Sequence, residues 1–84
     1  MSNIDLSSLA TANTVDARGS ACPGPLLEAK KGIGKVRVGE TLEIYSNDPG
    51  TRTDIPIWAK KVGHEYLGVV EADGYDRHFV RRNK

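Results

Sequence analysis

The sequence has one cysteine, no long apolar run and no excess of charge of either sign. A single cysteine cannot form an internal disulfide, which excludes the cross-link typical of small secreted domains and leaves the thiol of Cys22 to explain. No apolar stretch approaches the roughly 20 residues of a membrane span, and the N-terminus lacks the basic and apolar segments of a secretory signal. We therefore expect a cytoplasmic protein with no membrane partner.

The charges and histidines argue against two further kinds of site. Formal net charge is +1 and acids alternate with bases along the chain, so the basic footprint of a nucleic-acid-binding protein is missing. His64 and His78 are far apart and have no ligand cluster around them, so we expect surface histidines and no metal site. Gly32 and Gly34 lie inside a helical pattern rather than in a phosphate-binding loop. We expect no cofactor and no direct nucleic-acid partner.

The length of 84 residues fits one domain with one modest core. Residues 1–13 show no sustained period and are predicted to be a flexible tail, so the domain is expected to span residues 14–84. The predicted elements are a strand over 14–17, a helix starting at Pro25, a strand over 41–46 and a helix that includes 55–62. A hairpin of 66–72 and 75–82 follows, in which Asp73 and Gly74 are a strong signal for a two-residue turn. Each helix has one apolar face. The fold class is therefore an α/β (α+β) two-layer sandwich, β-α-β-α-β-β, with both helices on one face of a four-stranded mixed sheet and the other face toward solvent.

The two helices have distinct end signals. In the first, Gly32 and Gly34 weaken the last turns, so the helix is expected to fray or end early. In the second, Thr53 is a plausible N-cap because Pro56 would then fall in the first turn, although an earlier turn from Pro49 is also compatible with the pattern. Gly63 is expected to end this helix. Its predicted buried face consists of Ile55, Trp58, Ala59 and Val62.

The segment 16–25, Asp-Ala-Arg-Gly-Ser-Ala-Cys-Pro-Gly-Pro, contains the most informative chemistry. It places Cys22 on a strand-to-helix turn, where unpaired N–H groups and the helix dipole favour a thiolate. The thiolate is the nucleophilic form of cysteine, so a lowered pKa would activate it. Pro23 and Pro25 restrict the backbone on either side, and Gly24 offers an N–H group. The spacing alone is equally compatible with an inert, structural cysteine.

Nearby basic residues extend this candidate site. Arg18 and Lys30 could add positive charge close to Cys22. The basic concentration that includes Lys30 and Lys31 is either ordinary solvated surface or a docking patch for acidic partner proteins. Trp58 is expected to pack in the core rather than stack on a ligand.

The segment resembles the signature of the TusA/SirA-like sulfur carriers, a Cys-Pro-x-Pro turn reached through Asp-x-x-Gly. Five residues match this signature: Asp16, Gly19, Cys22, Pro23 and Pro25. The resemblance continues through residues 39–44, 47–49 and 54–56 and Trp58 into the hairpin, and so covers nearly all of residues 14–82. The family's β-α-β-α-β-β sandwich agrees with the fold predicted from the residue pattern.

The resemblance implies that Cys22 accepts sulfur as a persulfide from a cysteine desulfurase or a rhodanese-type donor and passes it to a sulfur-accepting relay protein. From the resemblance and the residue pattern together, we expect Asp16, Arg18, Gly19, Pro23, Gly24 and Pro25 to support the site and Lys30 and Lys31 to dock partners. Such a sulfurtransferase-type relay depends on its partners, and we expect a monomer. Family members serve tRNA thiolation, molybdenum cofactor synthesis or sulfur oxidation, and the Cys-Pro-Gly-Pro turn resembles the sulfur-oxidation members most.

One departure from the family affects the mechanism. Several relatives have a second cysteine directly after the aromatic residue of the second helix, where this chain has Ala59. An internal disulfide therefore cannot discharge the persulfide. The alternative function is a non-catalytic regulatory or protein-interaction module with a structural cysteine, and a third, an RNA-binding domain, depends on fold similarity alone.

Overall fold

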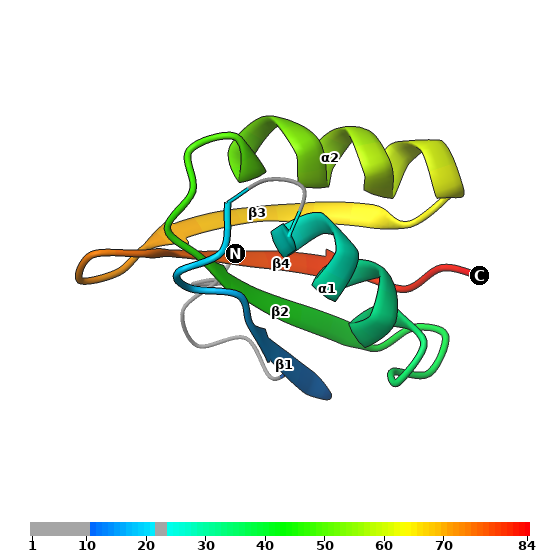
Figure 1. Ribbon diagram of the computed structural model, residues 1–84. Helices are drawn as coiled ribbons and strands as arrows, with labels where there is room; N and C mark the ends of the chain where they lie inside the picture. The colour runs from blue at the N-terminus through cyan, green and yellow to red at the C-terminus, as the bar shows by residue number, and fades with distance from the viewer. Residues whose placement is uncertain (1–10, 22–23) are drawn as a thin grey trace, which may run out of the picture.

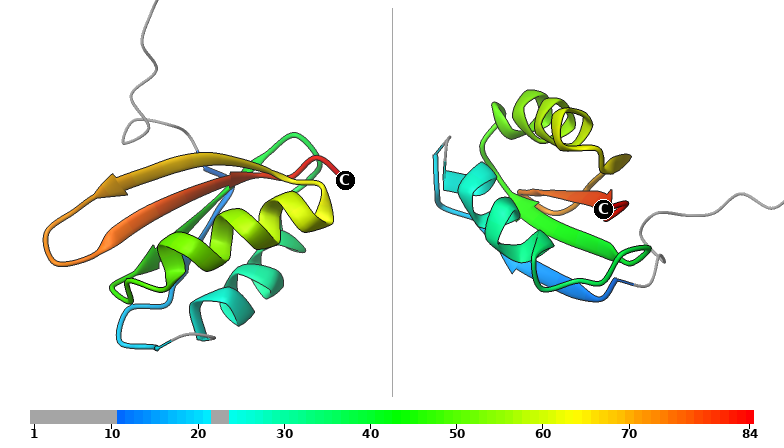
Figure 2. Two further views of the ribbon diagram at one scale, coloured as in Figure 1. Left: turned by 90° about the horizontal axis from the view of Figure 1, so that it is seen from above. Right: turned by 90° about the vertical axis from the view of Figure 1, so that its right-hand side faces the viewer.

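The computed structural model describes residues 11–21 and 24–84, which form one sheet and two helices (Figure 1). The elements are β1 Asn13–Asp16, α1 Gly24–Ile33, β2 Thr41–Ser46, α2 Thr51–Val62, β3 Glu65–Glu71 and β4 Asp76–Arg81. The strand order is β1-β2-β4-β3, with β1 parallel to β2 and the other neighbours antiparallel. Both helices lie on the same face of the sheet (Figure 2). The predicted two-layer sandwich is confirmed.

The core lies between the helices and the sheet. Alternation along β2 and β4 directs Leu42 and Val80, which are register partners, toward the helices. Trp58 on α2 is only 7% exposed, so its predicted place in the core is confirmed. The buried cluster consists of Ala29, Ile33, Val36, Leu42, Ile44, Ile55, Trp58, Ala59 and Val80.

The first helix is short and packs closely on the sheet. It ends at Ile33, as the two glycines predict, although Val36 beyond its end is still buried. A Cβ atom at Gly32 would lie 2.8 Å from Val15 Cγ2 and 3.0 Å from Leu42 Cδ1. Gly32 therefore permits a close approach of α1 to β1 and β2, a role that propensity alone does not suggest.

The second helix begins earlier than the predicted Thr53 N-cap. Its N-cap is Gly50, which makes no side-chain cap, and Pro56 lies inside the helix instead of in its first turn. The reason is a tertiary contact, because the buried Thr51 hydroxyl forms a 2.7 Å hydrogen bond with that of Ser46 at the end of β2. This pair holds the first residue of α2 against the sheet and extends the helix upstream of the proline.

The end of α2 matches one prediction and contradicts another. Gly63 adopts the left-handed conformation, with φ of 87°, and the His64 N–H donates to the Ala59 carbonyl at 2.8 Å, which closes the helix as predicted. Val62, in contrast, is 40% exposed, so its predicted burial is wrong. The buried stripe of α2 ends one turn earlier, at Ala59.

The sheet face opposite the helices is not uniformly open to solvent, so that prediction is wrong at its centre. Phe79 is fully buried, and alternation places it on the face opposite to Val80. The Arg77 guanidinium lies over the Phe79 ring, 5.4 Å from its centroid, and forms an ion pair with the nearly buried Glu43. The aliphatic and planar parts of Arg77 thus cover an aromatic ring on this face.

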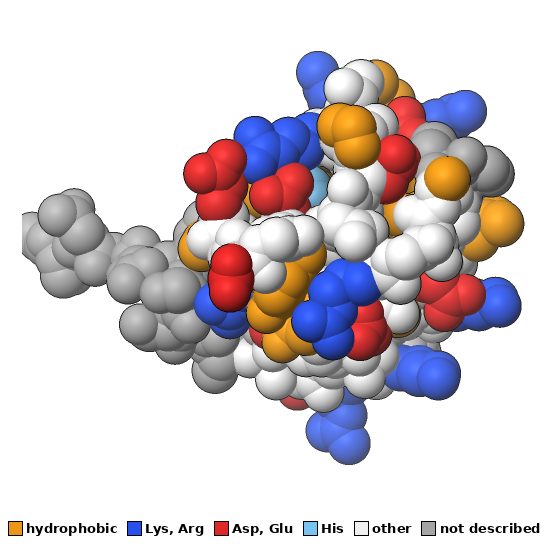
Figure 3. All heavy atoms as spheres, turned by 60° about the vertical axis from the view of Figure 1, so that its left-hand side comes forward, with side chains coloured by type: hydrophobic (Ala, Val, Ile, Leu, Met, Phe, Trp, Pro, Cys, Tyr) orange, Lys and Arg blue, Asp and Glu red, His pale blue; other side chains and the backbone are white. Residues whose placement is uncertain are grey.

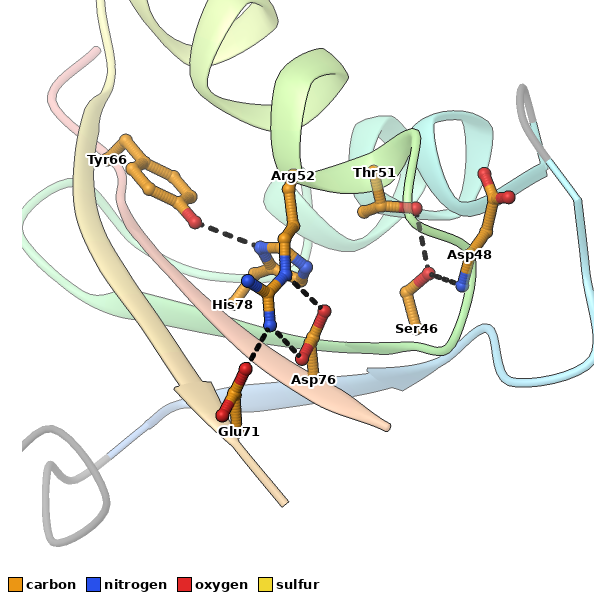
Figure 4. Close-up of polar contacts among 8 residues, drawn as sticks. All are labelled: Ser46, Asp48, Thr51, Arg52, Tyr66, Glu71, Asp76 and His78. Carbon is orange, nitrogen blue, oxygen red and sulfur yellow. Dashed lines mark hydrogen bonds and ion pairs between the residues drawn. The ribbon is translucent and has the colours of Figure 1, made fainter. Parts of the chain in front are cut away.

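His78 is fully buried under α2, so its predicted surface position is wrong (Figure 4). It lies on the helix-facing side of the central strand β4, where its Nδ1 and the Tyr66 hydroxyl are 2.9 Å apart and its Nε2 has no hydrogen-bond partner. Burial lowers the pKa of His78 and raises that of Tyr66 to about 12. Arg52 covers the same region and bonds Asp76 and Glu71 (Figure 4).

The hairpin follows its turn signal. The Ala72 N–H donates to the Tyr75 carbonyl at 2.8 Å, and Gly74 has a φ of 83°, which an L-residue rarely adopts. The predicted turn at Asp73 and Gly74 is therefore confirmed, and it leaves Tyr75 directly before β4.

Candidate functional site

Three connections meet at one end of the sheet. Because β1 and β2 are parallel, the β1–α1 and β2–α2 connections leave the sheet at the same end of the strands. The register partner of Ser46, the last residue of β2, is Asp76, the first residue of β4, so the β3–β4 turn lies at this end as well. The segment that leads to Cys22 thus adjoins two other loops (Figure 1).

Backbone hydrogen bonds order the described part of the β1–α1 connection. The Ala17 N–H donates to the Tyr45 carbonyl at 2.9 Å and continues the pairing of β1 with β2. The Gly19 N–H donates to Asn47 Oδ1 at 3.0 Å, which ties this connection to the one after β2. Gly19 has a φ of 87°, so the site-supporting role predicted for it corresponds to a conformation that favours glycine.

Cys22 and Pro23, two of the predicted site residues, lie outside the described residues. The two residues that flank them are hydrogen-bonded to each other, since the Gly24 N–H donates to the Ala21 carbonyl at 2.7 Å. Gly24 is also closely packed, because a Cβ atom there would lie 2.9 Å from Ser20 Cβ. Gly24 therefore allows the start of α1 to lie close to Ser20, and its supporting role stays a prediction.

Helix α1 starts immediately after this dipeptide, at Gly24, with Pro25 as its second residue. No acidic side chain lies in its first turn, and Lys30 and Lys31 lie in its last turn. The first N–H groups of a helix have no partner within it, and its dipole places partial positive charge there. The beginning of α1 therefore favours an anion, as the sequence predicts for the Cys22 sulfur.

Arg18 and Asp16 form a bidentate ion pair. The Arg18 Nε donates to Asp16 Oδ1 at 2.9 Å and its Nη2 donates to Oδ2 at 2.7 Å. Hydrogen bonds from the Arg18 side chain and backbone hold the pKa of Asp16 at about 2, and the same pair raises the pKa of Arg18. The guanidinium also lies over the rings of Tyr75 and Tyr45, at 4.7 and 5.3 Å from their centroids.

Sequence reasoning did not identify Tyr45, Tyr75 or Asn47 as part of this site. Tyr45 has a visible signal, since alternation along β2 directs it away from the core, but nothing in the sequence pairs it with Arg18. Asn47 follows β2 and therefore lies at the end of the sheet where β1 also ends, so the parallel topology could have indicated its place in the site. Tyr75 becomes a neighbour only through the antiparallel pairing of β2 and β4.

A groove lies between the two helices, with a volume of about 210 Å³. Leu26 and Lys30 of α1 face residues of α2 across it, and Ile57 is 61% exposed. Lys31, the other predicted docking residue, does not line the groove. Its Nζ lies 3.6 Å from Glu28 Oε2 in an ion pair on the same helix. The complete lining consists of Leu26, Lys30, Asp54, Ile57, Trp58 and Lys61. The lining thus begins within the first turn of α1, and it combines apolar side chains with two lysines and one aspartate.

Residues 11–21 and 24–84 contain neither a metal-binding cluster nor a membrane-spanning helix. No group of three or more His, Cys, Asp or Glu side chains in these ranges is arranged to hold a metal ion. No helix in them is long and apolar enough to cross a membrane.

Comparison with known proteins gives a consistent result. A family model described as "Sulfurtransferase TusA" matches residues 13–82. A protein of Archaeoglobus fulgidus named "Putative sulfur carrier protein" is 49% identical over 70 residues, covering 83% of this chain and 96% of the relative. "Sulfur carrier protein TusA" of Pseudomonas entomophila is 36% identical over 69 residues, covering 82% of this chain and 86% of the relative.

A solved structure supports the fold independently. The crystal structure of a SirA-like protein from Desulfitobacterium hafniense superposes with a TM-score of 0.74 at 23% identity. The match covers 86% of this chain and 99% of the other. At this level of identity the similarity shows a shared fold.

Proposed function

The chain belongs to the TusA sulfurtransferase family, whose members are named sulfur carriers, and we propose that it carries one sulfur atom as a persulfide on Cys22. One observation supports this most directly: the only cysteine of the chain lies two residues before α1, whose first turn contains no acidic side chain. The positive end of the helix favours both the thiolate and the more acidic persulfide.

Loading and unloading are two sulfur exchanges without net oxidation. The Cys22 thiolate attacks the terminal sulfur of a persulfide on the donor, the donor's S–S bond breaks, and the donor's thiolate leaves. Cys22 then holds the terminal sulfur until the thiolate of an acceptor attacks it and Cys22 leaves as a thiolate. The donor is a cysteine desulfurase or a rhodanese-type protein, and the acceptor is another relay protein.

The loaded form should be long-lived without a partner. Ala59, where several relatives have a second cysteine, is fully buried on α2, and the chain has no other thiol. Discharge therefore requires a partner protein, a small thiol or a second copy of the chain. A reducing compartment such as the cytoplasm supplies the conditions in which Cys22 stays free to react.

The groove between α1 and α2 supports a docking role for Lys30. A partner with an apolar side chain flanked by acidic groups would match its lining, in which Leu26 and Ile57 are apolar and Lys30 and Lys61 are basic. Because Leu26 is the third residue of α1, a partner seated there would also reach the helix start. Lys31 would contribute through its charge at a greater distance.

Mass spectrometry tests the proposal. Incubation with a cysteine desulfurase and cysteine, or with a rhodanese and thiosulfate, should add the mass of one sulfur atom, which a reductant removes. The Cys22→Ser variant is the matched control and should gain no sulfur. An alkylation pKa near the ordinary value of roughly 8.5, together with no adduct from either donor, would favour an interaction module with a structural cysteine.

A further inference from the structure

The residues around Arg18 form a cluster that joins three separate parts of the chain. We call Asp16, Arg18, Tyr45 and Tyr75 the Arg18 cluster; they come from β1, the β1–α1 connection, β2 and the β3–β4 turn. The two tyrosine rings are 5.1 Å apart, centroid to centroid, and the guanidinium contacts both. Figure 3 shows this end of the molecule, where acidic, basic and apolar side chains are interspersed.

The positive charge of Arg18 is paired within this cluster. Both hydrogen bonds from the guanidinium to Asp16 are short, so the carboxylate directly neutralises the positive charge of Arg18. The planar guanidinium lies over the rings of Tyr45 and Tyr75, a contact that a lysine ammonium cannot reproduce with the same geometry. An Arg18 held in this way is poorly suited to stabilise a thiolate on Cys22 by its charge.

The same contacts restrain the backbone that leads to Cys22. The Arg18 N–H donates to Asp16 Oδ1 at 3.1 Å, so side chain and backbone of this residue are held by one carboxylate. The next residue, Gly19, is bound to Asn47. The connection is thus attached to β2 and to the following loop by its backbone, and to the hairpin by the Arg18 side chain.

We propose that Arg18 is a positioning residue, which fixes the β1–α1 connection as far as Gly19 against Tyr45 and Tyr75 and so speeds sulfur transfer between Cys22 and a partner that docks at this connection. The proposal rests on the sulfur-carrier function of Cys22. A connection that is already ordered loses less conformational entropy when a partner docks, so protein-to-protein transfer is faster. Tyr45, Tyr75 and Asn47 share this role.

Substitutions can separate a positioning role from a charge role. Arg18→Met removes the ion pair and the ring contacts, whereas Arg18→Lys keeps the charge and loses the planar bidentate geometry. At the other side of the contact, Tyr75→Phe keeps the ring and Tyr75→Ser removes it. Asn47→Ala removes the acceptor of the Gly19 N–H and serves as a second route if the Arg18 variants fail to fold.

Three measurements are made on each variant: amide hydrogen exchange at Gly19, the pH dependence of Cys22 alkylation by iodoacetamide, and the rate of sulfur loading from a cysteine desulfurase with cysteine. We expect Arg18→Met, Arg18→Lys and Tyr75→Ser to raise Gly19 exchange about tenfold, because the two arginine variants lose or weaken both cation–π contacts and Tyr75→Ser loses the shorter one. Loading should slow by about the same factor while the alkylation midpoint stays unchanged. Tyr75→Phe should behave as the wild type in all three assays.

Several outcomes would overturn the positioning role. If Arg18→Met raises the alkylation midpoint, Arg18→Lys restores it and Gly19 exchange is unchanged, Arg18 acts by its charge. If exchange rises but loading does not slow, the cluster is structural only. If the wild type accepts no sulfur at all, the carrier function fails, whereas unchanged exchange at Gly19 in every variant would refute the restraint itself.

Discussion

His78 should make the stability of this protein depend on pH between about 7 and 5. Burial lowers the pKa of His78 in the folded chain, a neighbouring Arg52 lowers it further, and Asp76 opposes the shift. The unfolded chain, whose histidines titrate near 6.5, therefore takes up this proton first as the pH falls. The free energy of unfolding is fully present above about pH 6.5 and declines as the pH decreases toward the folded pKa.

The structure sets the size of this effect. The His78 ring is fully buried, and its only hydrogen bond among the described residues is the one at Nδ1 with Tyr66, so a proton on Nε2 would have no acceptor. One proton bound only by the unfolded state changes the free energy of unfolding by at most about 1.4 kcal/mol per pH unit. Between pH 7 and 5 we expect a loss of about 1 to 2 kcal/mol.

Urea unfolding followed by circular dichroism at several pH values measures this loss. The double variant His78→Phe with Tyr66→Phe keeps two aromatic rings and leaves neither polar group unpaired, so it should remove most of the pH dependence. His64→Gln measures the separate share of the other histidine, whose pKa is also lowered, by burial and then by Arg82 and Lys84. Above pH 5 the lowered pKa values of Asp16 and Asp76 do not contribute, because aspartates are ionised in both states. An equal slope in the wild type and the double variant would refute this account of His78.

Three further predictions concern packing, the thiol and docking. Gly32→Leu should lower the free energy of unfolding by about 1 to 3 kcal/mol in urea titrations, because a side chain there meets β1 and β2, whereas Gly34→Ala should change it by less than about 0.5 kcal/mol. Equal effects would mean that α1 adjusts its position. Cys22→Ser should melt within a few degrees of the wild type and accept no sulfur; a large loss of stability would indicate a buried structural cysteine. Lys30→Glu should slow sulfur transfer between proteins more than Lys31→Glu does, most clearly at low salt and without changing alkylation by iodoacetamide, since Lys30 lines the groove. An equal effect of Lys30→Glu on alkylation would mean that this lysine acts on the thiolate itself.

The sequence by itself determined the order of the elements and most of the core. Each of these depends on local periodicity, as in the stripe of Ile55, Trp58 and Ala59 on α2, or on a turn residue such as Gly63. The family resemblance likewise depends on a contiguous motif around Cys22, and the match over residues 13–82 confirms the family. The roles of individual site residues remain predictions.

Only the tertiary structure decided which residues meet across the sheet. The start of α2 at Thr51 depends on a hydroxyl pair with Ser46, and the burial of His78 depends on the helix packed over β4. Helix and strand propensities and residue spacing contain no information on such contacts, because these residues are far apart in the sequence and meet only when the strands pair and the helices pack on them. For the same reason the sequence suggested that Arg18 could add positive charge close to Cys22, whereas the fold places its guanidinium between Asp16 and two tyrosines. Tyr45 approaches it through the pairing of β1 with β2, and Tyr75 through the pairing of β2 with β4.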